Sequence, residues 1–200
     1  MRIMFPIFDE RSRIIGFGGR TVNGSNAKYI NSMETPVFDK SRNMYGINVA
    51  KDAIEYSKKD YIIACEGYMD VIAFHQQGYW NAVASLGTAL TREHVKLMKK
   101  YVNTVYLAYD SDLPGTCAAA KAIDLVESEG MTAKLINLKP WKDPDEFAKN
   151  EGREALRKRI ENASEEAKWK AKARSLNQKS GKFPNDVISL ISKYMEENIE

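Results

Sequence analysis

The stretch YLAYDSDLPG (residues 106–115) places two aspartates directly after a run of apolar residues. The apolar run predicts a buried strand, and the Pro-Gly pair that follows predicts a turn or the start of a helix. Asp110 and Asp112 therefore lie one residue apart at the carboxyl end of that strand. Because two carboxylates this close repel each other, their position indicates a site that holds a cation.

Strands and helices are expected to alternate along the middle of the chain. The pattern predicts strands at 61–65, 80–85, 104–109 and 133–138, and helices at 70–77, 92–100, 116–129 and from 143 onward. Such alternation with short loops is typical of an α/β fold, a parallel sheet flanked by helices. In these sheets ligands bind just beyond the carboxyl ends of the strands.

The two ends of the chain have a different pattern. Strands at 2–8 and 13–20 are predicted to form a hairpin, followed by a helix from Arg42 to about Lys58 that Ser41 caps. After Gly152 the chain is charged and helical, with a break at 175–185 and a last amphipathic helix. The expected domains are an N-terminal basic α+β lobe (1–60), a parallel-sheet domain (61–150) and a C-terminal helical subdomain (151–200).

Composition limits the function classes. The 200 residues are 44% hydrophobic and 28% charged, which suits a globular core, and the net charge of +3 is too small to identify a nucleic-acid binder. Cys65 and Cys117 are interpreted as buried free thiols of a reducing compartment. His75 and His94 are too far apart in sequence to suggest a zinc site. Since no apolar run approaches the ~20 residues of a membrane span, we expect a cytoplasmic protein.

Acidic residues follow three of the predicted strands. Glu66 ends the first strand, Asp110 and Asp112 end the third, and Asp143 and Asp145 come just after the fourth. Oxygen ligands without His or Cys favour a hard ion such as Mg²⁺ or Mn²⁺, which keeps positions open for substrate phosphates. The alternative is local: an aspartate at 143 or 145 also suits a helix N-cap, and Asp112 also suits a turn.

Several motifs together resemble a known family. ACEGYMD (64–70), AYDSD (108–112) and KDPDEF (142–147) resemble the Toprim fold of bacterial-type primases, topoisomerases and some nucleases. EGYMDVIAFHQQGYWNAVASLGTALT (66–91), with RIMFPI, GFGGR, KYINS and ETPVFDK upstream, is similar to DnaG-type DNA primases. The resemblance covers about residues 1–150. Ser111 and Pro114 stand where that family usually has Gly and Ala.

The resemblance implies a set of site residues. It assigns catalysis and metal binding to Glu66, Asp110 and Asp112, and an additional acidic pair to Asp143 and Asp145. The residues that it assigns to nucleotide or nucleic-acid binding are Arg20, Lys28, Tyr29, Asn31, Lys40 and Asp70.

The implied function is RNA primer synthesis on single-stranded DNA during replication. A 3′-hydroxyl would attack the α-phosphorus of a ribonucleoside triphosphate, with Mg²⁺ or Mn²⁺ as cofactor. The replicative helicase and a zinc module are implied partners, through regions that we expect this chain to lack. With two cysteines in all, the chain itself is expected to bind no zinc.

Two alternative functions stay open. One is another Toprim enzyme, a nuclease or a piece of a topoisomerase, which would break strands. The other is a non-catalytic nucleic-acid-binding module. Intact acids at 66, 110 and 112 argue against the second, and the primase-like upstream lobe argues against the first.

Overall fold

The first three strands form an antiparallel sheet. In the computed structural model, which describes residues 1–23 and 27–180, these strands are β1 (Arg2–Phe8), β2 (Ile14–Thr21) and β3 (Tyr29–Asn31), in the order β1-β2-β3. The turn between β1 and β2 is held by Asp9, whose Oδ1 accepts hydrogen bonds from the backbone N–H groups of Arg11 and Arg13. The predicted hairpin is therefore confirmed.

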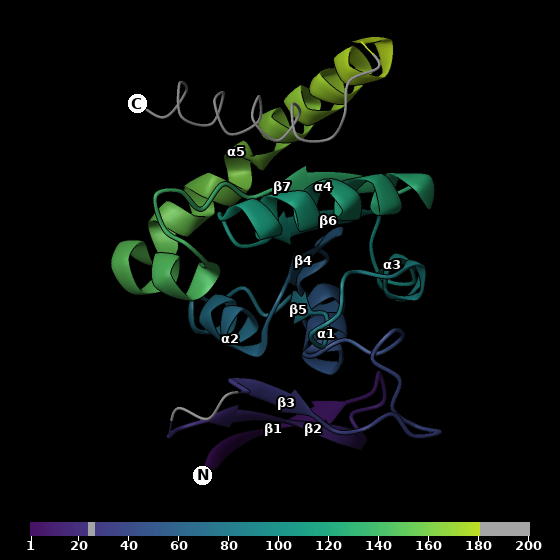
Figure 1. Ribbon diagram of the computed structural model, residues 1–200, viewed down its shortest axis with the longest axis vertical. Coiled ribbons are helices and arrows are strands. Elements are labelled where there is room, and N and C mark those ends of the chain that lie inside the picture. The colour runs from purple at the N-terminus through teal and green to yellow at the C-terminus, as the bar shows by residue number, and fades with distance from the viewer. Residues whose placement is uncertain (24–26, 181–200) are drawn as a thin grey trace.

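A second sheet of four parallel strands lies above the first in Figure 1. It consists of β4 (Tyr61–Cys65), β5 (Ala82–Ala84), β6 (Thr104–Ala108) and β7 (Thr132–Leu135), in the order β5-β4-β6-β7. Each connection between successive parallel strands contains a helix, as is usual in βαβ units. The α/β fold class predicted from the alternation is confirmed.

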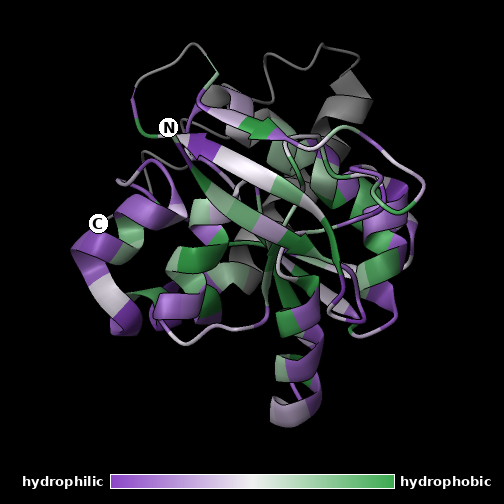
Figure 2. Ribbon diagram, turned by 90° about the horizontal axis from the view of Figure 1, so that it is seen from below, coloured by the Kyte–Doolittle hydropathy of each residue, from purple (hydrophilic) through white to green (hydrophobic). Residues whose placement is uncertain are grey.

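Helices cover both faces of the parallel sheet. They are α1 (Ile47–Ser57), α2 (Tyr68–Gln76), α3 (Arg92–Lys99), α4 (Leu113–Ser128) and α5 (Pro144–Ser180). Side chains alternate along β4: Ile62 and Ala64 pack with α1, α3 and α4, whereas Ile63 and Cys65 pack with α2 and α5. This period of two buries the strand on both sides. Figure 2 shows the hydrophobic residues gathered on the strands and the inner helix faces.

The first helix begins later than predicted. It starts at Ile47 rather than Arg42, so Ser41 is not its cap. The Asp39 carboxylate instead accepts hydrogen bonds from the backbone N–H and the hydroxyl of Ser41, at 2.8 and 2.6 Å. Such local side-chain bonds compete with a helix. Tyr45 then pairs with Ala84 of β5, which keeps the segment before the helix extended.

Other boundaries differ by a few residues. The helix predicted at 70–77 begins at Tyr68, and the helix predicted at 116–129 begins at Leu113. The strands predicted at 80–85 and 133–138 are shorter, Ala82–Ala84 and Thr132–Leu135. Helix α5 has non-helical backbone at Gly152 and continues to Ser180, through the first part of the predicted break.

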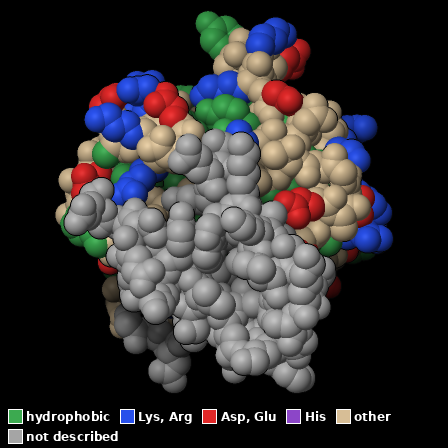
Figure 3. All heavy atoms as spheres, turned by 90° about the horizontal axis from the view of Figure 1, so that it is seen from above, with side chains coloured by type: hydrophobic (Ala, Val, Ile, Leu, Met, Phe, Trp, Pro, Cys, Tyr) green, Lys and Arg blue, Asp and Glu red, His purple; other side chains and the backbone are tan. Residues whose placement is uncertain are grey.

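Some predictions lie outside the described part of the chain. These are the last amphipathic helix, beyond residue 180, and the side chain of Cys117, whereas Cys65 is a buried free thiol. The domain boundaries at residues 60 and 150 stay a prediction. On the face seen in Figure 3, the described Lys and Arg side chains are mixed with Asp and Glu. No helix among the described residues is long and apolar enough to cross a membrane.

Candidate functional site

The carboxyl ends of β4 and β6 bring two of the predicted acids together. The strands are hydrogen-bonded neighbours with Cys65 opposite Ala108, so the residues that follow them leave the sheet side by side. The backbone N–H of Asp110 donates a hydrogen bond to Glu66 Oε1 at 3.2 Å. Glu66 and Asp110 thus converge at one edge of the sheet, because β4 and β6 are neighbours.

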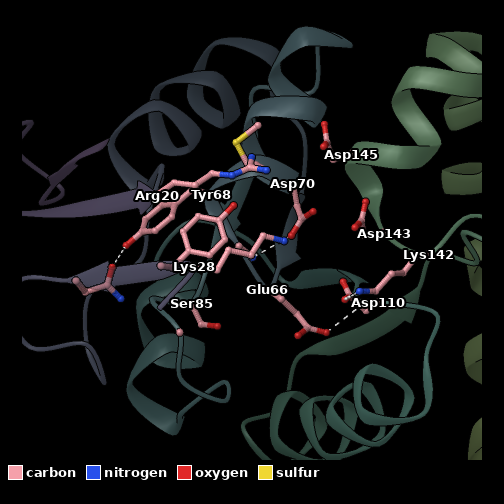
Figure 4. Close-up of a pocket in the computed structure, with 15 residues that line it drawn as sticks. Arg20, Lys28, Glu66, Tyr68, Asp70, Ser85, Asp110, Lys142, Asp143 and Asp145 are labelled. Atoms are coloured by element: carbon pink, nitrogen blue, oxygen red, sulfur yellow. Dashed lines mark hydrogen bonds and ion pairs between the residues drawn. The ribbon is translucent and has the colours of Figure 1, made fainter. Parts of the chain in front are cut away.

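A backbone hydrogen bond brings the second acidic segment to the same edge. The N–H of Ser111 donates to the carbonyl oxygen of Lys142 at 2.7 Å. This bond ties the loop after β6 to the residues that lead into α5. Asp143, directly before α5, consequently lies near Asp110, whereas Asp145, in the first turn of α5, lies further from it (Figure 4).

These acids line one wall of a cavity of about 270 Å³. Arg20 of β2 and Lys28, directly before β3, lie on the opposite side (Figure 4), and Tyr29 and Asn31 of β3 also line the cavity. The cavity therefore lies between the two sheets. The predicted site residues that line it are Arg20, Lys28, Tyr29, Asn31, Glu66, Asp70, Asp110, Asp143 and Asp145.

Two predicted site residues do not line the cavity. Asp112 is the N-cap of α4, where its Oδ1 accepts from the backbone N–H of Gly115 at 2.9 Å. Lys40 lies in the loop before α1, and its carbonyl oxygen is 2.9 Å from Nε2 of the buried His94. The structure thus provides a local role for Asp112, in line with the turn alternative.

Asp143 caps a helix and also lines the cavity. Its Oδ1 accepts from the backbone N–H of Glu146 at 2.8 Å, which caps the first turn of α5, and the residue also lines the cavity. Asp145 makes an ion pair with Lys149 at 2.6 Å. Capping uses one carboxylate oxygen of Asp143 and leaves the other for a ligand.

Three of the acids that line the cavity, Glu66, Asp70 and Asp110, hold their protons more tightly than free carboxyl groups do. Burial raises the pKa of Glu66 and of Asp110, and neighbouring carboxylates add to the effect in both. Asp70 is only 8% exposed, and burial raises its pKa to about 7, against the hydrogen bond from the Gly67 N–H. A cation in the cavity would relieve this cost, because it favours the ionised forms.

Asp70 should make stability depend on pH. Its pKa is about 7 in the folded protein against an ordinary 3.8, so the folded state binds more protons between these values. Stability is therefore expected to fall as pH rises from about 4 to about 7. Asp70→Asn, which can still accept from Gly67, should remove this dependence and stabilise the protein at pH 8 by up to about 4 kcal/mol.

Urea unfolding at pH 4.5 and pH 8 without divalent ions measures this effect. The matched control is Asp52→Asn, at an exposed position of α1, which should change stability little at either pH. Equal responses of the two variants to pH would contradict the assignment of a raised pKa to Asp70.

Sequence reasoning missed several residues that line the cavity. Lys142 Nζ lies 3.9 Å from Asp110 Oδ2, and the loop after β5 contributes Ser85 and Gly87. Tyr68, at the start of α2, also lines it. Lys142 directly precedes the acidic pair and Ser85 ends a predicted strand. Their positions near the carboxyl ends of strands could therefore have identified both as candidate site residues.

The donor set fits a hard divalent ion. The cavity offers carboxylate oxygens from Glu66, Asp70, Asp110, Asp143 and Asp145, and no histidine or cysteine lines it. Carboxylate oxygen donors of this kind match Mg²⁺ or Mn²⁺. Within the described residues, no three acidic, His or Cys side chains are already gathered as a cluster that could hold a metal ion. Side-chain rotation would be needed for shared ligation.

Two family models match the chain. Residues 1–51 match the model described as the DNA primase catalytic core, N-terminal domain. Residues 63–148 match the model described as Toprim-like. The two matches correspond to the antiparallel sheet with the start of α1, and to the parallel sheet with the acidic edge.

Curated and solved relatives agree with these models. A DNA primase of Clostridium acetobutylicum is 45% identical over 162 residues, which are 81% of this chain and 27% of the relative. The structure of the Aquifex aeolicus primase zinc-binding and RNA polymerase domains is 40% identical, with a TM-score of 0.76 over 81% of this chain and 40% of that one. A structure of the DnaG primase catalytic domain bound to ssDNA is also 40% identical, with a TM-score of 0.74 over 81% of this chain and 51% of that chain.

The chain is short relative to these proteins. It spans about a quarter of the length of the curated relatives that it matches, and about half or less of these solved structures. Within this chain, the two family models together cover the two sheets.

Proposed function

This chain belongs to the DnaG-type bacterial DNA primase family and matches part of its catalytic core, and on that premise we propose that it synthesises RNA primers on a single-stranded DNA template. The observation that carries the proposal is the cavity between the two sheets. Carboxylates line one side of it, and Arg20 and Lys28 line the other. A nucleoside triphosphate with its metal ions needs both kinds of group within one cavity.

The cationic side of the cavity suits a triphosphate. Lys28 and Arg20 lie against the Tyr29 ring, with Nζ and Cζ at 5.9 and 5.8 Å from its centroid. Cation–π contact orients both positive charges on the same aromatic ring. We assign phosphate binding to Arg20 and Lys28, and contact with the base or ribose to Tyr29.

The acidic side would hold Mg²⁺ or Mn²⁺ through Glu66 and Asp110, with Asp143 and Asp145 as the additional pair. When bound, the ions supply activation of the attacking hydroxyl and neutralisation of the leaving phosphates. Lys142, beside Asp110, is a further cation for the released pyrophosphate. Asp112 would act indirectly in this scheme, because its Oδ1 bond to Gly115 shapes the loop that carries Asp110.

A strand-breaking Toprim enzyme is less well supported. A topoisomerase needs a tyrosine nucleophile, and Tyr29 and Tyr68 both line the cavity. Burial raises the pKa of each phenol, which disfavours the phenolate that would attack DNA.

The proposed partners are a DNA template, ribonucleoside triphosphates and, through other parts of the protein, a helicase and a zinc module. The proposed location is the cytoplasm, where the Cys65 thiol stays reduced.

One assay separates primer synthesis from strand cleavage. Labelled ribonucleotides, a single-stranded template with an annealed primer, and Mg²⁺ or Mn²⁺ are incubated with the protein. We expect primer extension that EDTA abolishes and that weakens as salt rises, because phosphate contacts release counterions. Template shortening without incorporation would instead identify a nuclease, and template binding without either reaction would identify a non-catalytic module.

A further inference from the structure

Tyr68 joins the two halves of the cavity. It is the first residue of α2, two positions after Glu66, and it is 5% exposed. Its ring stacks on Phe5 of β1, with centroids 5.3 Å apart and planes at 1°, and makes a T-shaped contact with the Tyr45 ring, with centroids 4.7 Å apart. A side chain from the acidic half is therefore packed into the antiparallel sheet that carries the cations.

The hydroxyl of Tyr68 makes the polar part of the same junction. It donates a hydrogen bond to Asn31 Oδ1 (Figure 4). Asn31 Nδ2 in turn donates to the carbonyl oxygen of Leu86 at 2.8 Å. Both ends of the Asn31 amide are thus bound by segments that leave the parallel sheet. Asn31 ends β3, whose first residue is Tyr29 and which follows Lys28 directly.

Gly18 shows how closely the two halves approach. It pairs with Asn31 across β2 and β3, and a Cβ at this position would lie 2.5 Å from both Cζ and the hydroxyl of Tyr68. Because real Cβ atoms do not approach other atoms so closely, the Tyr68 ring occupies the space that a side chain at position 18 would need. This close packing of the Tyr68 ring against β2 and β3 fixes the position of β3 relative to Glu66.

We infer that Tyr68 is a positioning residue. Through Asn31 it holds Lys28 and Tyr29 opposite the carboxylates of the cavity, so that one bound nucleotide can contact both the cationic and the acidic side. The inference rests on the proposed function for its substrate, a ribonucleoside triphosphate. Tyr68 acts through Asn31 and β3, so its loss should weaken nucleotide binding more than the chemical step.

The test uses two variants of this junction. Tyr68→Phe keeps the stacked ring and loses the hydroxyl, whereas Asn31→Ala removes the acceptor of that hydroxyl and also the bond to Leu86. For Tyr68→Phe, one lost hydrogen bond of about 1 kcal/mol predicts a rise of about fivefold in the KM for ribonucleotides, and Asn31→Ala should raise this KM at least as much. Primer extension should show this rise with kcat within about twofold of the parent, and the double variant should be no worse than Asn31→Ala.

The control is Tyr45→Phe, which removes a hydroxyl from the neighbouring ring of the same aromatic cluster. Its KM should equal that of the parent. A merely structural role for Tyr68 would lower thermal stability and leave KM unchanged. An unchanged KM in Tyr68→Phe, or effects of the two variants that add in the double variant, would overturn the inference.

A second measurement needs no catalysis. Hydrogen exchange over residues 28–32 should be about fivefold faster in Tyr68→Phe than in Tyr45→Phe, because the opening of β3 becomes easier. If the parent protein extends no primer, the proposed function fails while this exchange result still tests the junction. Equal exchange in the two variants would refute the junction, even in an active enzyme.

Discussion

An Asp110→Asn variant is expected to lose more than 100-fold in primer extension. Mutation of a residue that only hydrogen-bonds to a metal ligand already lowers metal affinity or activity about 10- to 100-fold, so loss of the ligand itself should lower activity more. Asp110 is half-buried at the end of β6, and its pKa is raised by burial and by Asp143. The amide keeps the shape of the side chain and removes the charge that would hold the ion.

The same variant should fold at least as well as the parent. Because the pKa of Asp110 is raised, ionisation costs stability above its ordinary value, and the neutral amide avoids this cost at pH 8. Thermal unfolding without divalent ions measures this, and calorimetry with Mn²⁺ measures the metal. The control is Glu55→Gln, at an exposed position of α1, which should leave both unchanged. Parent-like metal binding or extension in Asp110→Asn would refute the metal site.

A Gly115→Ala variant should lose both stability and activity. A Cβ at residue 115 would lie 2.8 Å from the carbonyl carbon and from the Cβ of Asp110, so the backbone of one segment must move. Overpacking against backbone costs about 1–3 kcal/mol, and we expect about 3 kcal/mol here. The displaced segment carries Asp110, so primer extension should fall with the stability.

Pro114→Ala is the matched control for this prediction. Residue 114 is exposed in the same turn of α4, and a proline there mainly pre-orders the start of the helix. The control should change the free energy of unfolding by less than about 1 kcal/mol and keep activity. Urea unfolding and primer extension of both variants check this, and a fully active Gly115→Ala protein would show that the segment tolerates the shift.

Local patterns predicted which acids follow strands because a strand end is a property of a short segment, whereas the order β5-β4-β6-β7 that brings these acids together is a tertiary property. Glu66 and Asp110 follow apolar runs, and the runs of β4 and β6 are long enough to be recognised alone. The family resemblance added Arg20, Lys28 and Tyr29, which no local pattern connects to those acids. All five residues line the cavity.

The start of α1 was predicted less well, and the structure gives Asp112 a local role as a helix cap. Ser41 and Asp112 are both good N-cap residues, and propensity alone does not say which of them caps. The backbone N–H and the hydroxyl of Ser41 both donate to the Asp39 carboxylate, and Tyr45 pairs with Ala84, in a strand 39 residues further on. At residue 112 the cap forms and turns the side chain to Gly115.

Short stretches of sequence were enough to predict the α/β class, the hairpin and the acids that follow strands, since each depends on hydrophobic period and on nearby turn residues. Long-range packing alone shows that Lys142 lies beside Asp110, that Asn31 bonds to Tyr68 and Leu86, and that Gly18 and Gly115 have no room for a Cβ. These contacts join residues that are far apart in the chain or depend on ångström-scale packing. Their energies arise from how closely whole sheets and helices approach, which no periodic pattern encodes.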